Sequence, residues 1–260
     1  MTRVITLLSD FGTQDGYLGA MKGVLASRAP GVQLLDLAHD IEPGNIAAAS
    51  FALRQAFPEF PAATVHLGVV DPGVGSERLA LAAAIAGQLV VAPDNGLLSG
   101  VLADWPCEAA CALDADALGA DRISPVFHGR DLFAPAAAAL ARGTPLVELG
   151  TSLSLERLVR LPGSKTERRD GCVVGVIQHC DRFGNLISNL RPGDLAGAEV
   201  FLGDRRVPLH RTYSDVSAGS LLAVVGSHGF YEIACAGGSA ADACRAGLGD
   251  VVTLRPPARS

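Results

Sequence analysis

The chain has 260 residues, of which 49% are hydrophobic and only 5% aromatic, and its formal net charge at pH 7 is −6. A chain of this length buries a substantial core, in one large domain or in two unequal ones. The negative charge and the absence of a dense Lys/Arg cluster argue against a nucleic-acid-binding surface. Every apolar run is interrupted well before the roughly 18–20 residues that a membrane-spanning helix needs, so we expect no membrane segment.

The first ten residues are typical of a β-strand and not of a secretory signal peptide, because their apolar run is short and no cleavage site follows. We therefore expect a cytoplasmic protein. Its cysteines show neither Cys-x-x-Cys spacing nor a His-x-His pattern, which gives a zinc site little support. In a reducing compartment we expect free thiols at these positions. They are Cys107, Cys111, Cys172, Cys180, Cys235 and Cys244.

The first half of the chain alternates between strand and helix signals. Short apolar runs bounded by turn residues predict strands over residues 3–8, 32–37, 64–70, 79–86 and 88–92. Apolar residues at helical spacing predict helices over residues 16–28, 45–57 and 131–142. This alternation predicts an N-terminal three-layer α/β domain over residues 1–162, with a central, largely parallel sheet.

The character of the sequence changes at the polar, linker-like segment 161–170. Beyond it, short β-rich pieces follow one another closely with turn signals between them, over residues 172–179, 185–188, 199–202, 221–225, 231–234 and 250–254. This spacing predicts a smaller C-terminal domain over residues 171–260, with an antiparallel, barrel-like sheet.

The most informative stretch runs from His66 to Arg78, where a predicted buried strand ends at Asp71 and a glycine-rich turn follows. Ligands of open α/β sheets bind at the carboxyl ends of the strands, which is where Asp71 stands. The Pro-Gly step after it forces a sharp turn. Arg78 can then fold back onto Asp71 as a charged, forked pair. An ordinary strand-end turn held by a structural salt bridge is the alternative interpretation.

Polar clusters stand at four predicted strand or loop ends, over residues 9–15, 71–78, 93–96 and 127–131. Each has a plain structural explanation, because Asp and Asn cap helices and close turns, and His128 can be a core histidine. Four such clusters in one predicted domain nevertheless indicate an active site.

These clusters also resemble a known family. Ser-Asp-Phe-Gly-Thr-x-Asp, Val-Asp-Pro-Gly-Val-Gly, Pro-Asp-Asn-Gly and Phe-His-Gly-Arg-Asp occur here in that order, followed by Asp-Arg-Phe-Gly-Asn at 181–185 and Gly-Ser at 226–227. Together they are similar to the S-adenosylmethionine hydroxide adenosyltransferases, the hydrolytic relatives of the fluorinase and chlorinase. The likeness covers nearly the whole chain, including the predicted domain break.

The resemblance implies that water splits S-adenosylmethionine at the ribose C5′ carbon, giving adenosine and L-methionine, with no cofactor. It implies that the water-activating residues are Asp71, Arg78 and His128. It assigns the substrate contacts to Asp10 at the ribose hydroxyls, Phe183 and Asn185 at the adenine, and Ser227 near the methionine carboxylate. Which of Asp71 and His128 takes the proton stays open.

The resemblance further implies a homotrimer, because in this family the site lies between the first domain of one subunit and the second domain of its neighbour. The halogenating relatives carry an aromatic residue where this chain has Asp71, which favours a hydrolase here. The fluorinase also has arginine where this chain has His228.

The residues themselves are suited to this chemistry. A sulfonium is already a good leaving group, so the reaction needs a positioned, partly desolvated water and no general acid. An aspartate can accept the proton of that water, while Arg78 and His128 orient it.

Two alternative functions stay open. One is a metal-dependent phosphohydrolase, with ligands among Asp10, Asp71, Asp94, His128 and Asp131. The other is a non-catalytic protein that binds S-adenosylmethionine or a nucleoside.

Overall fold

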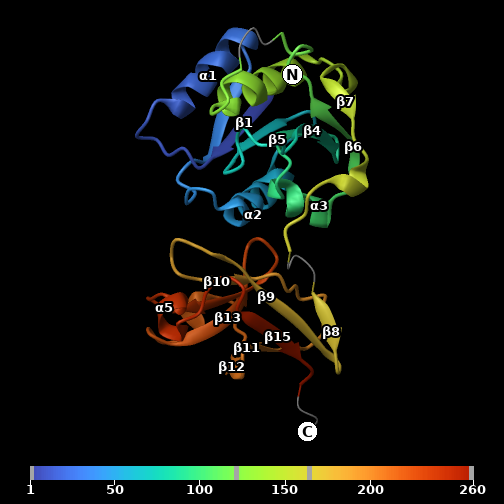
Figure 1. Cartoon of the computed structure of the whole chain (residues 1–260). Helices are drawn as coiled ribbons and strands as arrows, with labels where there is room; N and C mark the ends of the chain where they lie inside the picture. The colour runs from blue at the N-terminus through green and yellow to red at the C-terminus, as the bar shows by residue number, and fades with distance from the viewer. Residues whose placement is uncertain (1–2, 120–122, 163–165, 258–260) are drawn as a thin grey trace. The chain divides into compact units, whose positions relative to one another are not determined.

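The computed structural model describes residues 3–119, 123–162 and 166–257. The chain divides into two compact units, Met1–Leu161 and Pro162–Ser260 (Figure 1). Of the segment predicted as a linker, residues 163–165 lie outside the described residues, and Glu167–Arg169 forms a strand that pairs with the next one. No helix among the described residues is long and apolar enough to cross a membrane.

The first unit is built on a seven-stranded sheet with the order β2-β1-β3-β5-β4-β6-β7. Its strands are β1 Val4–Ser9, β2 Gln33–Ala38, β3 Val65–Val69, β4 Ala80–Ile85, β5 Gln88–Pro93, β6 Cys107–Leu113 and β7 Gly150–Ser152. The pairings from β2 to β5 are parallel. Those from β5 through β4 and β6 to β7 are antiparallel, so the sheet is mixed. A turn at Gly87 joins β4 and β5 as a hairpin.

Helices cover both faces of this sheet, as the predicted three-layer domain requires. They are α1 Tyr17–Arg28, α2 Ile46–Ala56, α3 Val101–Asp104 and α4 Ala134–Arg142. One apolar cluster joins α1 and α4 to side chains such as Leu7 and Leu67. A second joins α2 to the opposite face, through Leu8 and Val70. Because successive strand residues point to opposite faces, neighbouring Leu7 and Leu8 fall in different clusters.

Short helices complete this unit. The 3-10 helices are Phe57–Glu59, Leu97–Ser99, Leu146–Glu148 and Leu155–Arg157, and Gly129–Phe133 forms a π-helix that leads into α4. Asn45 caps the N-terminus of α2, because its side chain accepts a hydrogen bond from Ala48 N at 2.9 Å.

The second unit is an eight-stranded sheet with the order β12-β11-β15-β9-β10-β14-β13, in which β8 pairs with β9. The strands are β8 Glu167–Arg169, β9 Cys172–Cys180, β10 Leu186–Ser188, β11 Glu199–Leu202, β12 Arg205–Val207, β13 Leu221–Val225, β14 Tyr231–Cys235 and β15 Val251–Arg255. A 3-10 helix, Tyr213–Asp215, and α5, Ala240–Cys244, complete the unit. All the strand pairings are antiparallel. A bridge from Leu209 to Ala223 nearly closes the sheet around one apolar core, which confirms the barrel-like prediction.

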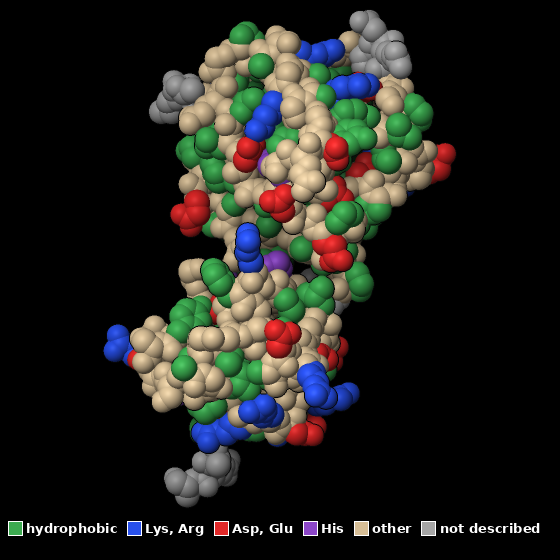
Figure 2. All heavy atoms as spheres, turned by 90° about the vertical axis from the view of Figure 1, so that its left-hand side faces the viewer, with side chains coloured by type: hydrophobic (Ala, Val, Ile, Leu, Met, Phe, Trp, Pro, Cys, Tyr) green, Lys and Arg blue, Asp and Glu red, His purple; other side chains and the backbone are tan. Residues whose placement is uncertain are grey.

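Charge is mixed on the surface. On the face drawn in Figure 2, each unit shows both acidic and basic side chains. Several side chains of opposite charge form ion pairs, including Lys22 with Asp36 and Arg206 with Glu199.

Candidate active site

The parallel part of the first sheet brings two of the predicted polar clusters to one edge. Ser9, the last residue of β1, is paired with Val69, the last residue of β3. Asp10 and Asp71 therefore both leave the sheet at the carboxyl ends of neighbouring parallel strands. Asn95 supports this edge, because its side-chain amide donates to Val70 O at 2.8 Å, directly before Asp71.

Asp71, Arg78 and His128 form one connected set. Arg78 Nε donates to Asp71 Oδ1 at 2.9 Å, and Arg78 Nη2 donates to Asp71 Oδ2. The same Nη2 lies 2.8 Å from His128 Nδ1. The Asp71 and Arg78 side chains are only 6% and 10% exposed, so these bonds are largely shielded from water. The structure thus brings together the three residues that the sequence proposed as the water-activating set.

The hydrogen bond from Arg78 determines the state of the His128 ring. A guanidinium can only donate, so His128 Nδ1 must accept and the ring proton must lie on Nε2. Burial lowers the pKa of His128, and the positive charge of Arg78 lowers it further, against the opposing effect of Asp71 and Asp131. The ring is therefore neutral at pH 7, and Nε2–H is a donor.

The π-helix Gly129–Phe133 begins directly after His128 and is packed closely at its first residue. A side-chain carbon at Gly129 would lie 3.1 Å from Met21 Sδ and 3.4 Å from the Phe11 ring. Asp131 anchors the loop before the π-helix, because its carboxylate accepts from Ser124 N at 2.8 Å and pairs with Arg130. Isolated π-helical turns of this kind are often found at functional sites.

Asp10 is held by the main chain of another loop. Its Oδ2 accepts a hydrogen bond from Gly44 N at 2.8 Å. The neighbouring Ser9 lies with its hydroxyl 2.8 Å from His39 Nδ1, and His39 Nε2 lies 3.2 Å from Asp36 Oδ1. These contacts fix the loop on which Asp10 stands. His39 was not among the predicted site residues, although it stands at the end of the second predicted strand.

A cavity of about 440 Å³ joins these side chains, and its lining includes Asp10, Asp71 and His128. Such a volume is typical of small-molecule sites. Its wall includes the aromatic rings of Phe11 and Phe127, whose centroids lie 5.9 Å apart. Tyr17 packs against Phe127 at 5.3 Å. Both phenylalanines belong to motifs that the sequence shows, but their place in the cavity wall was not predicted.

The proposed metal-ligand set finds no support in these contacts. Both oxygens of Asp71 accept hydrogen bonds from Arg78. Asp94 accepts from Val159 N at 2.9 Å, and Asp131 anchors its own loop. Within residues 3–119, 123–162 and 166–257, no group of three or more His, Cys, Asp or Glu side chains is placed to hold a metal ion.

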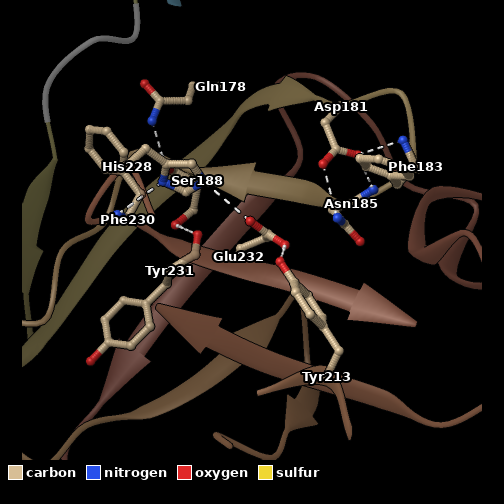
Figure 3. A network of polar contacts seen from close by, with 10 residues as sticks. All are labelled: Gln178, Asp181, Phe183, Asn185, Ser188, Tyr213, His228, Phe230, Tyr231 and Glu232. Carbon is tan, nitrogen blue, oxygen red and sulfur yellow. Dashed lines mark hydrogen bonds and ion pairs between the residues drawn. The ribbon is translucent and has the colours of Figure 1, made fainter. Parts of the chain in front are cut away.

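The remaining predicted contacts lie in the second unit (Figure 3). Asp181 organises the turn that carries two of them: its Oδ1 accepts from Phe183 N and Asn185 N, and its Oδ2 from the Asn185 amide, all at 2.9 Å. The ring of Phe183 is 76% exposed, whereas Asn185 is buried. Ser227 lies exposed on the turn between β13 and β14.

Comparison with known proteins gives a consistent result. The family model of the SAM hydroxide adenosyltransferase N-terminal domain matches residues 5–150, and that of the C-terminal domain matches residues 175–253. A protein of Thermus thermophilus named (R)-S-adenosyl-L-methionine hydrolase is 43% identical over 93% of this chain and 95% of its own length. One of Salinispora tropica with the same name is 42% identical over 92% of each chain.

Solved structures show the same fold. An uncharacterised conserved protein from Thermotoga maritima superposes with a TM-score of 0.88 at 32% identity, over 96% of this chain and 99% of its own.

Proposed function

Because the chain belongs to the SAM hydroxide adenosyltransferase family, we propose that it hydrolyses (R)-S-adenosyl-L-methionine to adenosine and L-methionine. Two relatives that are 42–43% identical to this chain are named for this activity, and the match covers nearly their whole length. The structural observation that carries the proposal is the cavity into which Asp10, Asp71 and His128 converge.

In the proposed reaction, the oxygen of a water molecule attacks the ribose C5′ carbon in line with its bond to sulfur. That bond breaks, and its electron pair converts the sulfonium into the neutral thioether of methionine. The leaving group needs no proton, so the single proton to be removed is that of the attacking water. Asp71 and His128 are the groups available to handle it.

The hydrogen bonds favour Asp71 as the acceptor of that proton. His128 Nδ1 already accepts from Arg78, and Nε2 carries the ring proton, so the neutral imidazole can only donate to the water. Each Asp71 oxygen accepts one bond from Arg78 and keeps further acceptor capacity. We therefore assign proton acceptance to Asp71, orientation of the carboxylate to Arg78, and stabilisation of the developing hydroxide to His128 Nε2–H.

We assign the remaining residues to substrate binding. Asp10, fixed by Gly44, accepts hydrogen bonds from the vicinal ribose hydroxyls. The exposed Phe183 ring stacks on the adenine, Asn185 contacts its polar edge, and Ser227 binds the methionine carboxylate. No cofactor enters this scheme, because S-adenosylmethionine supplies both the electrophile and the leaving group.

We further propose a homotrimer in which a neighbouring subunit supplies Phe183, Asn185 and Ser227. Large apolar side chains at the cavity support this, since Val126 in its lining is 75% exposed and Tyr17 beside Phe127 is 52% exposed. A neighbouring subunit would cover such a surface. Light scattering at assay concentration is expected to give a trimer, and a fully active monomer would contradict it. We place the enzyme in the cytoplasm, which agrees with its six free cysteines.

The test is a product analysis. The protein is incubated with S-adenosylmethionine in ¹⁸O-labelled water. The products are separated by chromatography and their masses are measured by mass spectrometry. We expect equimolar adenosine and methionine, with the heavy oxygen in the adenosine 5′-hydroxyl and a preference for the (R) sulfonium over the (S) diastereomer. Saturable binding without product formation would support the non-catalytic alternative. Activity that disappears on exhaustive chelation would support the metal-dependent one.

A further inference from the structure

Ser227 stands on a tight turn that closes on itself. Gly226 N donates to Phe230 O and Gly229 N donates to Gly226 O, each at 2.9 Å. Gly229 adopts φ +78°, a left-handed conformation that favours glycine. Because Ser227 itself is exposed, the conformation of this turn determines the direction in which its hydroxyl and main-chain N–H point.

The side chain of His228, the residue after Ser227, points into the protein and not toward solvent. The His228 side chain is only 6% exposed, and its Nδ1 accepts a hydrogen bond from Phe230 N at 3.2 Å. Its ring lies against the backbone of the turn, because a side-chain carbon at Gly226 would be 2.5 Å from His228 Cε1 and Nε2. The His228 ring therefore packs against the turn, and Figure 3 shows its contacts with Phe230 and Glu232.

A buried carboxylate lies behind this ring. Since His228 Nδ1 accepts from Phe230 N, the ring proton lies on Nε2, which is 3.2 Å from Glu232 Oε2. Tyr213 donates its hydroxyl to the other oxygen, Glu232 Oε1, at 2.6 Å. Burial opposes the ionisation of Glu232, but the hydrogen bonds from His228 and Tyr213 outweigh it and hold the pKa of that carboxyl below its usual range.

The chain of contacts joins three separate segments of the second unit. Tyr213 belongs to the 3-10 helix Tyr213–Asp215, Glu232 to β14, and His228 to the turn before β14. A buried carboxylate that receives a donor on each oxygen resists displacement, because breaking either bond leaves one buried oxygen without a donor. The turn is therefore held by charge-assisted bonds and not by the turn sequence alone.

We propose that His228, Glu232 and Tyr213 are positioning residues, which hold the Gly226–Gly229 turn so that Ser227 binds the amino-acid end of the substrate. This inference rests on the proposed function. A turn that is already ordered loses less conformational freedom on binding, so the set contributes to affinity without touching the substrate. The methionine end of the substrate is bound in both the ground and the transition state. Loss of this positioning is therefore expected to raise KM and to leave kcat nearly unchanged.

The test compares His228→Ala and Tyr213→Phe with a matched control, Ser188→Ala. Ser188 is fully buried in the same sheet and donates to the main-chain oxygen of Tyr231 at 2.8 Å, so its loss destabilises the unit but removes no hydrogen bond of the His228, Glu232 or Tyr213 side chains. We expect His228→Ala to raise KM about tenfold or more, and Tyr213→Phe to raise it about threefold, with kcat within about twofold of wild type. The control is expected to lower Tm and to leave KM unchanged.

A double variant tests whether His228 acts through Ser227. If it does, the combined Ser227→Ala and His228→Ala change raises KM scarcely more than the larger single effect. Additive effects of Ser227→Ala and His228→Ala on KM would overturn the inference. It would also be overturned if His228→Ala and Tyr213→Phe had the same KM as the Ser188→Ala control. Tyr213→Phe removes one hydroxyl from a half-exposed ring and keeps the test decisive if His228→Ala does not fold. Failure of the proposed function is distinct, because the wild-type protein would then release no adenosine.

Discussion

Gly75 lies so close to the carbonyl oxygen of Pro125 that a side-chain carbon at position 75 would be only 2.6 Å from it. This contact joins the loop between Asp71 and Arg78 to the segment that leads to His128. Gly75 also has φ +78°, which other residues rarely adopt. The distance between the Asp71–Arg78 pair and His128 therefore depends on a glycine that carries no functional group.

Replacing Gly75 by alanine is expected to damage catalysis through this contact. The methyl group must push the two segments apart, and a displacement of about 1 Å at reacting groups can cost roughly 100-fold in rate. We expect kcat to fall by about 10–100-fold. The control is Gly23→Ala in α1, where the added carbon meets nothing within 4 Å and φ is not left-handed. The control should keep wild-type kcat, and equal kcat in the two variants would show that the contact is unimportant.

Asp71→Asn tests the assignment of the proton acceptor. The amide keeps the size of the side chain and one acceptor but loses the charge, so S-adenosylmethionine should still bind. We expect kcat to fall by about 10²–10⁴, the usual range for general-base assistance. Adding Arg78→Ala should cost little more, since residues that act as a unit are strongly non-additive. A merely structural salt bridge would instead lower Tm and leave kcat near normal in a protein that remains folded.

Asp10→Ala should act on binding and not on chemistry. A charged acceptor of two ribose hydroxyls contributes equally to the ground and transition states, so its loss is expected to raise KM by about 10–100-fold with little change in kcat. Steady-state kinetics measures both constants. An unchanged KM together with a collapsed kcat would remove Asp10 from the ribose site.

The pH dependence of kcat/KM should report His128. Burial and the charge of Arg78 lower its pKa, so the neutral ring that accepts from Arg78 persists below the ordinary histidine value of 6.5. Activity is therefore expected to be retained at pH 6.5 and to fall only at more acidic pH, where the ring becomes protonated and loses that bond. His128→Gln, which cannot titrate, should be less active and should lack this acidic limb. An acidic limb unchanged in the variant would assign it to another group.

The stability of the first unit should also decrease in acid because of His66. This ring is fully buried between Thr6, at 2.7 Å from Nδ1, and Gln88, at 2.7 Å from Nε2, and burial lowers its pKa below 6.5. The unfolded chain thus binds the proton more readily, so stability is lost as pH falls from about 6.5 toward the folded pKa.

Thermal melts at pH 8 and at more acidic pH measure this effect. We expect a smaller acid-induced drop in Tm for His66→Gln than for wild type, even though the variant is less stable at pH 8. Identical acid-induced drops would show that other groups determine the acid sensitivity.

The sequence by itself determined the strands and turns that carry the site. The apolar run into β3 and the Asp-Pro-Gly step are local signals, because proline and glycine restrict the backbone wherever they stand. The same holds for the Asp181–Asn185 turn, whose hydrogen bonds span only four residues. Such features require no knowledge of the rest of the chain.

Only the tertiary structure decided the features that depend on distant partners. Strand β6 has no β-branched residue and forms because it pairs with β4. The antiparallel pairings of β4 with β5 and β6 make the sheet mixed. The neutral state of His128 follows from Arg78, fifty positions away. The sequence shows no partner for His228, whose ring the folded chain packs against Gly226 and Glu232. The backbone conformation of a turn depends on residues that are neighbours in the sequence. The burial and the protonation state of a side chain depend on groups that only folding brings together.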